Sequence, residues 1–169
     1  MYSYRNEKLY TDNLSVERFS STNVEELFIW KNGTPLSNLK KAALDNKINS
    51  KLSLINQFRV SHNFPVEEFN QEFKSVSAVW RIYLLHIIKP KEYPIYDQHI
   101  HRAYQFLNGF DSTGITNKLK ETEKTDFYFG QYLPFVRNLN VGDLKKMDEA
   151  FFAFGQFLNT GNYRKMVEN

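Results

Sequence analysis

The amino-acid sequence predicts an all-α fold, built as a compact multi-helix domain. Apolar residues recur at helical spacings of three and four, and no segment alternates cleanly between apolar and polar residues as a half-buried strand does. Only 7 Gly and 5 Pro occur among 169 residues, which argues against the many tight turns of an all-β sandwich or barrel. The 15 Phe, 10 Tyr and 2 Trp supply enough apolar area for a dense core in so short a chain.

The N-terminal half is expected to hold several helices after an arm. The arm covers residues 1–20, and its first dozen residues are expected to be weakly ordered. Thr22 or Asn23 is the predicted cap of a short helix, which Gly33 ends in a left-handed conformation. Three further helices are expected. The first begins near residues 35–37, the second carries the apolar residues 52–60, and the third starts at Pro65.

The segment of residues 78–88 differs from its neighbours because only Arg81 and His86 interrupt an apolar run. A helix that is apolar on nearly every side is predicted to be the buried central one. A buried parallel strand is the competing interpretation, since Val and Ile favour strands, but the length of the run and the absence of flanking Gly favour a helix. Pro90 and Pro94 then bracket a short extended link.

A further helix is expected over residues 97–108, with Asp97 as its cap and Gly109 at its end. The polar stretch over residues 111–125 has room for one exposed helix.

The C-terminal region is expected to form helices that pack on the core over residues 126–160. Residues 126–138 predict a helix rich in Phe and Tyr, which Pro134 either kinks or ends. The last helix is expected over residues 143–158, with Asp143 as its cap.

The composition excludes several classes of protein. The absence of cysteine excludes a disulfide scaffold, a thiolate-bound iron–sulfur cluster, a thiol nucleophile and a Cys-based zinc site. No apolar run reaches about 18 residues, so no membrane span is expected, and the charged first dozen residues predict no signal peptide. The formal charge of +3 permits a nucleic-acid partner without demanding one. We therefore expect a soluble cytoplasmic protein of one domain, or of two lobes that share one core.

Asp97 is the first candidate for chemistry. Asp is common at helix starts, and the simplest interpretation is an N-cap that accepts hydrogen bonds from backbone amides. The functional interpretation is a fixed carboxylate that faces a cleft, where its charge stabilises a cationic transition state or orients a water molecule.

A metal site is the weaker alternative for this region. Asp97 and His101 are four residues apart and share a helix face, but a metal would need another ligand such as His86 or His62. Nothing in the spacing requires this arrangement, so no metal and no cofactor is expected.

The order of these features resembles that of the helix-hairpin-helix DNA glycosylases, a base-excision superfamily with an essential Asp. The resemblance rests on a helix, a short turn at Ser75-Val76-Ser77, a buried helix, and the motif Pro-hydrophobic-x-Asp-x-His-hydrophobic-x-Arg over residues 94–102. It is clearest over residues 73–107, within a hairpin-like and catalytic-Asp region of residues 65–108. It implies the all-helical fold of that superfamily.

The resemblance implies a role for each matching residue. Asp97 would assist departure of the base and stabilise the oxocarbenium-like sugar, and His99 would lie near a DNA phosphate. Arg102 would be one of the basic residues around the cleft that contact DNA. Trp80 and Tyr83 would line a base pocket, with packing in the core as the alternative for both. The DNA-binding residues of the hairpin would be Lys74, Ser75, Val76 and Ser77.

Two departures from the family pattern shape the prediction. Ser75 and Ser77 stand where the family usually has glycine, and serine lacks glycine's freedom to adopt positive φ. Ala78 or Val79 falls where strand-cutting members carry a lysine nucleophile, so no lyase step is expected. The resemblance thus implies a monofunctional DNA N-glycosylase that acts on a flipped base. A non-catalytic nucleic-acid-binding module on the same fold and a helical protein-interaction domain are the alternatives, and the sequence does not indicate an oligomeric state.

Overall fold

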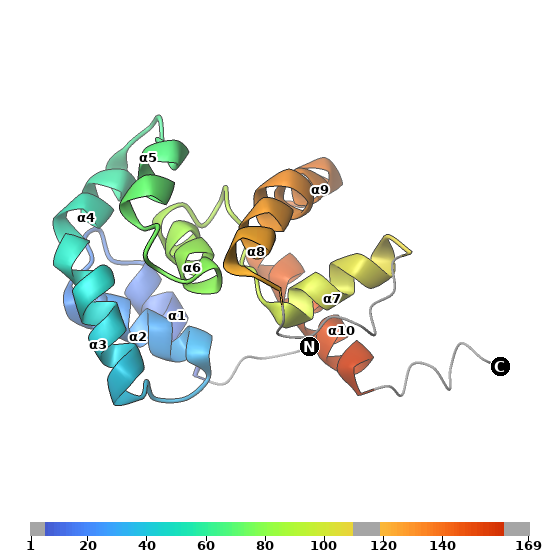
Figure 1. Ribbon diagram of the computed structural model, residues 1–169, viewed down its shortest axis with the longest axis horizontal. Coiled ribbons are helices and arrows are strands. Elements are labelled where there is room, and N and C mark those ends of the chain that lie inside the picture. The colour runs from blue at the N-terminus through green and yellow to red at the C-terminus, as the bar shows by residue number, and fades with distance from the viewer. Residues whose placement is uncertain (1–5, 110–118, 161–169) are drawn as a thin grey trace. The chain divides into compact units, whose positions relative to one another are not determined.

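The computed structural model describes residues 6–109 and 119–160, and within these ranges every regular element is a helix. The predicted all-α class is therefore confirmed (Figure 1). The chain divides into two compact units, Ser3–Lys89 and a second unit that begins at Pro90. This boundary falls at the proline-flanked link that the sequence predicts, while the expectation of a single domain over residues 1–169 stays a prediction.

The first unit, Ser3–Lys89, contains helices joined by short turns (Figure 1). Its described elements are α1 (Glu7–Leu14), α2 (Ser21–Asn32), α3 (Asn38–Lys47), the 3-10 turn η1 (Asn49–Lys51), α4 (Leu52–Val60), α5 (Val66–Glu72) and α6 (Ala78–Ile88).

The N-terminal arm differs from the prediction, because residues 7–14 form the helix α1 and are not weakly ordered. Tyr10 and Asn13 on this helix are buried. The Tyr10 hydroxyl shares a 2.7 Å hydrogen bond with Nε2 of His86, and the Asn13 amide donates to a carboxylate oxygen of Glu26. These partners are distant in the sequence, so the local pattern of residues 1–20 gave no sign of them.

The start of α2 also differs in detail from the prediction. Ser20 is the N-cap, and its hydroxyl accepts a hydrogen bond from the backbone N–H of Asn23. The side-chain oxygen of Asn23 in turn accepts from the Ser20 N–H, which completes a capping box. Gly33 ends the helix with φ 74°, in the left-handed conformation that the sequence predicts.

The helix α6 is the buried centre of the first unit, and the strand alternative is wrong. All residues from Ile82 to Ile88 are at most 3% exposed. Each buried Leu or Ile side chain contributes about 1.5–3 kcal/mol to folding through loss of water-exposed apolar area. A helix buried on nearly all sides matches the continuous apolar run of its sequence.

The second unit contains the remaining helices and begins with the link that follows α6 (Figure 1). Its described elements are α7 (Gln98–Leu107), α8 (Glu121–Phe127), the π-helical turn η2 (Tyr128–Tyr132), α9 (Leu133–Leu139) and α10 (Leu144–Asn159).

The expected aromatic helix over residues 126–138 begins earlier and is interrupted. Glu121 starts α8, η2 follows, and Pro134 lies in the first turn of α9. Proline has no N–H to donate to the preceding turn, and the wider π-helical turn just before it accommodates the missing hydrogen bond. Of the predicted polar stretch over residues 111–125, the part over residues 111–118 lies outside the described residues.

The helices α7 and α10 pack at very close range. A Cβ atom placed on Gly155 of α10 would lie 1.9 Å from the backbone oxygen of His99 on α7. Only glycine permits this approach of the two helices, and the approach fixes the start of α7 against α10.

Candidate catalytic and DNA-binding residues

Asp97 lies at the start of α7 and caps this helix, as the sequence predicts. Its Oδ1 atom accepts hydrogen bonds from the backbone N–H groups of His99 at 2.9 Å and Ile100 at 3.0 Å. The residue as a whole is half-buried. Asp97 is thus an anchored anion at a half-buried position, which fits both interpretations of the sequence.

His99 and Arg102 pack close to Asp97 on the same helix. The Nη1 atom of Arg102 lies 3.2 Å from Nδ1 of His99 and donates to the backbone oxygen of Gly155 at 3.2 Å. Because a guanidinium only donates, Nδ1 of His99 is the acceptor and Nε2 carries the proton. The His99 ring also packs edge-on against Phe152, with 4.9 Å between ring centroids.

Arg102 is far less available for DNA than the sequence suggested. The residue is only 7% exposed. Burial lowers the pKa of the guanidinium, and the negative charge of Asp97 acts in the opposite direction. Its position against Gly155 favours a role in joining α7 to α10.

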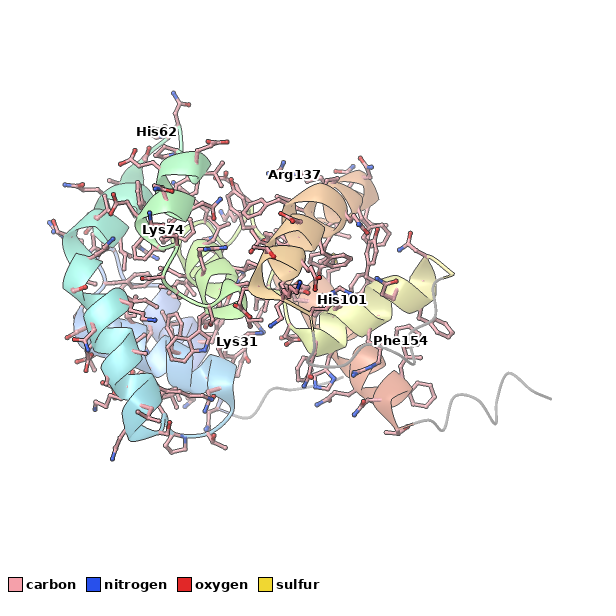
Figure 2. All side chains as sticks on the ribbon, in the orientation of Figure 1. Lys31, His62, Lys74, His101, Arg137 and Phe154 are labelled. Atoms are coloured by element: carbon pink, nitrogen blue, oxygen red, sulfur yellow. The ribbon has the colours of Figure 1, made fainter. Side chains whose placement is uncertain are left out.

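A turn over residues 73–77 joins α5 to α6, at the position where the resemblance places a hairpin. Lys74, Ser75 and Ser77 are exposed, whereas Val76 is buried and its N–H donates to the Phe73 oxygen at 2.9 Å. Figure 2 labels Lys74 among the side chains of this unit.

The serines of this turn cause no backbone strain. Within the described residues, the non-glycine residues with positive φ are Asn6 and Asn140. Ser75 and Ser77 therefore adopt ordinary negative φ values, and this turn does not require the glycines of the family pattern.

Trp80 and Tyr83 differ in their access to solvent. Tyr83 is fully buried, and its hydroxyl donates to the Leu27 oxygen at 3.0 Å. Burial raises the pKa of this hydroxyl well above its ordinary value. Tyr83 thus belongs to the core, which is the alternative that the sequence left open. Trp80 packs edge-on against Phe28 and is half-buried.

Sequence reasoning missed two side chains that hold the segment before Asp97. Asp148 on α10 is 1% exposed, and its Oδ2 accepts from the Ile95 N–H at 2.8 Å. The Tyr128 hydroxyl donates to the oxygen of Pro94 at 2.9 Å. Asp148 lies within the apolar stripe of its helix. A carboxylate at such a position predicts a buried, hydrogen-bonded group, and this is the sequence signal that could have identified Asp148.

His101 is part of a buried polar cluster rather than a metal ligand set. Its Nδ1 lies 2.7 Å from the Tyr96 hydroxyl, and its Nε2 lies 3.3 Å from the Gln105 amide nitrogen. Burial, reinforced by the charge of Arg102, lowers the pKa of the His101 ring to about 4. In the described part of the chain, no three His, Asp or Glu side chains gather as a metal site would require.

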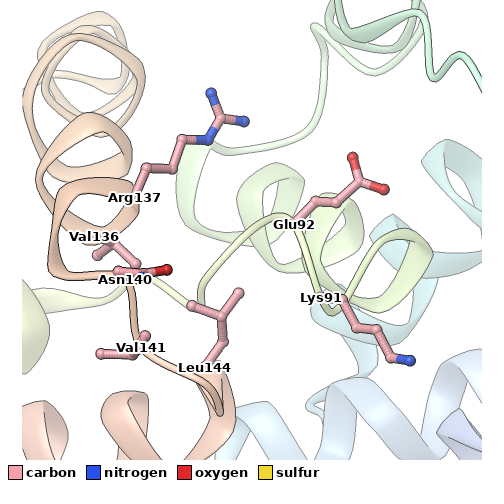
Figure 3. A pocket seen from close by; sticks show the side chains of 7 residues that line it. All are labelled: Lys91, Glu92, Val136, Arg137, Asn140, Val141 and Leu144. Carbon is pink, nitrogen blue, oxygen red and sulfur yellow. The ribbon is translucent and has the colours of Figure 1, made fainter.

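A pocket of about 300 Å³ lies elsewhere in the second unit (Figure 3). The side chains of Lys91 and Arg137 diverge at its rim, so they do not converge on one ligand. The lining residues, which do not include Asp97, are Lys91, Glu92, Val136, Arg137, Asn140, Val141 and Leu144.

Comparison with known proteins adds no relative. No family model, curated protein or solved structure matches this chain. The resemblance to the helix-hairpin-helix DNA glycosylases therefore stays a prediction from the sequence. For the described helices, none combines the length and the apolar character needed to cross a bilayer.

Proposed function

We propose that this protein binds DNA and hydrolyses the N-glycosidic bond of a flipped base, with Asp97 as the catalytic carboxylate. The observation that carries the proposal is the state of this residue: Asp97 is half-buried as a whole, and its Oδ1 accepts hydrogen bonds from two backbone amides. The order of elements supports it, since a helix, a turn with exposed serines and a buried helix precede Asp97 along the chain.

The chemistry needs one fixed negative charge. As the bond between the sugar C1′ and the base nitrogen breaks, its electron pair leaves with the base, and positive charge develops on the sugar. The Asp97 carboxylate stabilises this charge, and a water molecule then adds to C1′. The proton that the water loses balances the one that the departing base takes up, which leaves a free base and an abasic site. Ala78 and Val79 carry no amine, so the proposal includes no strand cleavage.

The test is incubation with a panel of lesion-bearing duplexes, followed by alkali to cut abasic sites. Asp97→Asn is expected to abolish base release while DNA binding persists. Asp143→Asn is the matched control, because Asp143 caps α10 by accepting from the Lys146 N–H at 3.1 Å. Both variants lose one charge at a helix start, and asparagine caps as well as aspartate. Equal activity of Asp97→Asn and the parent protein contradicts the proposal.

The second candidate is a non-catalytic helical module, favoured by one observation. Arg102 is buried against the Gly155 oxygen, and the His99 ring packs on Phe152. Packing therefore accounts for both residues without any role in DNA contact. This candidate predicts that no duplex of the panel yields abasic sites and that Asp97→Ala only destabilises the fold, by about 1 kcal/mol.

A further inference from the structure

One peptide group shortly before Asp97 is held by side chains at both of its ends. Its carbonyl, on Pro94, accepts a hydrogen bond from the Tyr128 hydroxyl at 2.9 Å. Its N–H, on Ile95, donates to Oδ2 of Asp148 at 2.8 Å. The peptide group lies in the link before α7, so a helical hydrogen-bond pattern does not set its orientation. The two side chains set it instead.

The held peptide group acts on Asp97 over a short distance. Consecutive Cα atoms lie about 3.8 Å apart, so the Cα atom of Asp97 is at most about 7 Å from that of Ile95. The residue between them, Tyr96, is 2% exposed, and its hydroxyl shares a 2.7 Å hydrogen bond with Nδ1 of His101 in α7. The backbone before Asp97 is therefore packed into the unit, and a shift of the peptide group moves the carboxylate.

A carboxyl group at position 148 is a costly choice for folding alone. Asp148 is 1% exposed, and the other buried residues of α10 are apolar or glycine. A well-packed apolar side chain often stabilises such a position more than a buried carboxyl group does. Tyr128, which holds the other end of the peptide group, is the first residue of the π-helical turn η2, and such turns are frequent at functional sites. Natural proteins depart from the most stable choice mainly where function requires it.

We propose that Asp148 is a positioning residue, which holds the Asp97 carboxylate in place for base release through the N–H of Ile95. Asp148 itself does not touch the substrate, and Tyr128 acts on the same peptide group from the carbonyl side. Asp148 lies outside the motif of residues 94–102 that carries the family resemblance. The inference rests on the catalytic role proposed for Asp97.

The test compares base release by Asp148→Leu and Asp148→Asn with that by the parent protein. Leucine has the branching of aspartate but accepts no hydrogen bond, whereas asparagine keeps an acceptor oxygen. A misplacement of about 1 Å can cost about 100-fold in rate, so Asp148→Leu is expected to lower kcat by about 10- to 100-fold. Its KM for the duplex is expected to stay parental, because the lost interaction is not one with DNA. Asp148→Asn is expected to restore most of kcat.

A second pair of variants tests the other end of the peptide group and carries the test if Asp148→Leu loses its helical circular dichroism. Tyr128→Phe removes only the hydroxyl that donates to Pro94, and it is expected to lower kcat without a change in KM. Tyr10→Phe is the matched control, because it removes a buried hydroxyl that is hydrogen-bonded to His86 in the other unit. This control is expected to keep the parental kcat.

Amide hydrogen exchange measures the positioning of Asp97 without any base release. The N–H groups of His99 and Ile100 donate to Oδ1 of Asp97. In Asp148→Leu and Tyr128→Phe, the exchange of these two amides is expected to accelerate more than that of amides in the middle of α10. In Asp148→Asn their exchange is expected to stay close to the parental rate. A side chain that only stabilises the unit accelerates the exchange of all these amides alike.

Three outcomes overturn the inference: parental kcat in the folded Asp148→Leu and Tyr128→Phe variants, equal losses in Asp148→Leu and Asp148→Asn, or equal losses in Tyr128→Phe and Tyr10→Phe. The failure of the proposed function is recognised separately. If the parent protein releases no base from any duplex, catalysis by Asp97 fails. Selective exchange at His99 and Ile100 then supports the positioning by Asp148, and uniform exchange overturns it. If the parent protein releases a base while the variants keep its kcat, the proposed function stands and the positioning role fails.

Discussion

The buried His101 ring predicts a loss of stability at mildly acidic pH. Its folded pKa is about 4, because burial and the positive charge of Arg102 both disfavour the protonated ring, whereas an unfolded histidine titrates near 6.5. Its neighbours Tyr96, Gln105 and Phe127 offer no negative charge to offset this. Between these two pH values the unfolded chain binds a proton that the folded protein does not. The contribution of the neutral His101 ring to the free energy of unfolding is therefore fully present above about pH 6.5 and is lost as the pH drops toward 4.

The size of the effect follows from the same two values. At 1.36 kcal/mol per pKa unit, the difference between 6.5 and about 4 amounts to about 3 kcal/mol, most of it lost by about pH 4.5. Urea unfolding of the parent protein and of His101→Gln at a series of pH values measures this loss. The carboxylates contribute equally to the pH dependence of the two proteins, so the difference between them isolates the contribution of His101. NMR titration of the ring gives the pKa directly. A ring that titrates near 6.5, or the same pH dependence in both proteins, refutes the reasoning.

Two further predictions concern the packing of the second unit. Gly155→Ala places a methyl group against the backbone oxygen of His99 and is expected to destabilise the protein by about 1–3 kcal/mol in urea unfolding. Gly130→Ala, where nothing lies within 4 Å of the added Cβ, is the control and is expected to be neutral or stabilising. Asp148→Ala leaves the buried N–H of Ile95 without its acceptor and is expected to cost about 1–3 kcal/mol, while Asp148→Asn, which keeps an acceptor oxygen, is expected to cost less. Equal losses in the two Asp148 variants would show that the hydrogen bond to Ile95 is unimportant.

Features of the fold that depend on local sequence were predictable. The apolar run of residues 78–88 identifies α6, and Asp97 after a proline-flanked link identifies the start of α7. The helix α1 was not predictable in this way, because the contact that orders it joins Tyr10 to His86, which is 76 residues away in the sequence.

The candidate site shows the same division between local and tertiary information. The cap made by Asp97 follows from its position before a helical stripe. Tyr83 and Arg102 are buried, and their donors are paired with the oxygens of Leu27 and Gly155 on other helices, which no spacing within the motif reveals. Residue type alone therefore overestimates how many polar side chains of a motif face a ligand.

A helix cap and a catalytic carboxylate make different demands on Asp97, and the structure allows both to be met at once. Capping needs an oxygen that accepts from two amides, and Oδ1 provides it. The proposed catalysis needs a negative charge that a substrate can reach, and the half-burial of the residue is compatible with that. Asparagine meets the first demand and not the second, whereas alanine meets neither. A protein in which Asp97→Asn is stable but inactive and Asp97→Ala is both less stable and inactive therefore uses this residue for both purposes, while a purely structural cap leaves Asp97→Asn indistinguishable from the parent protein.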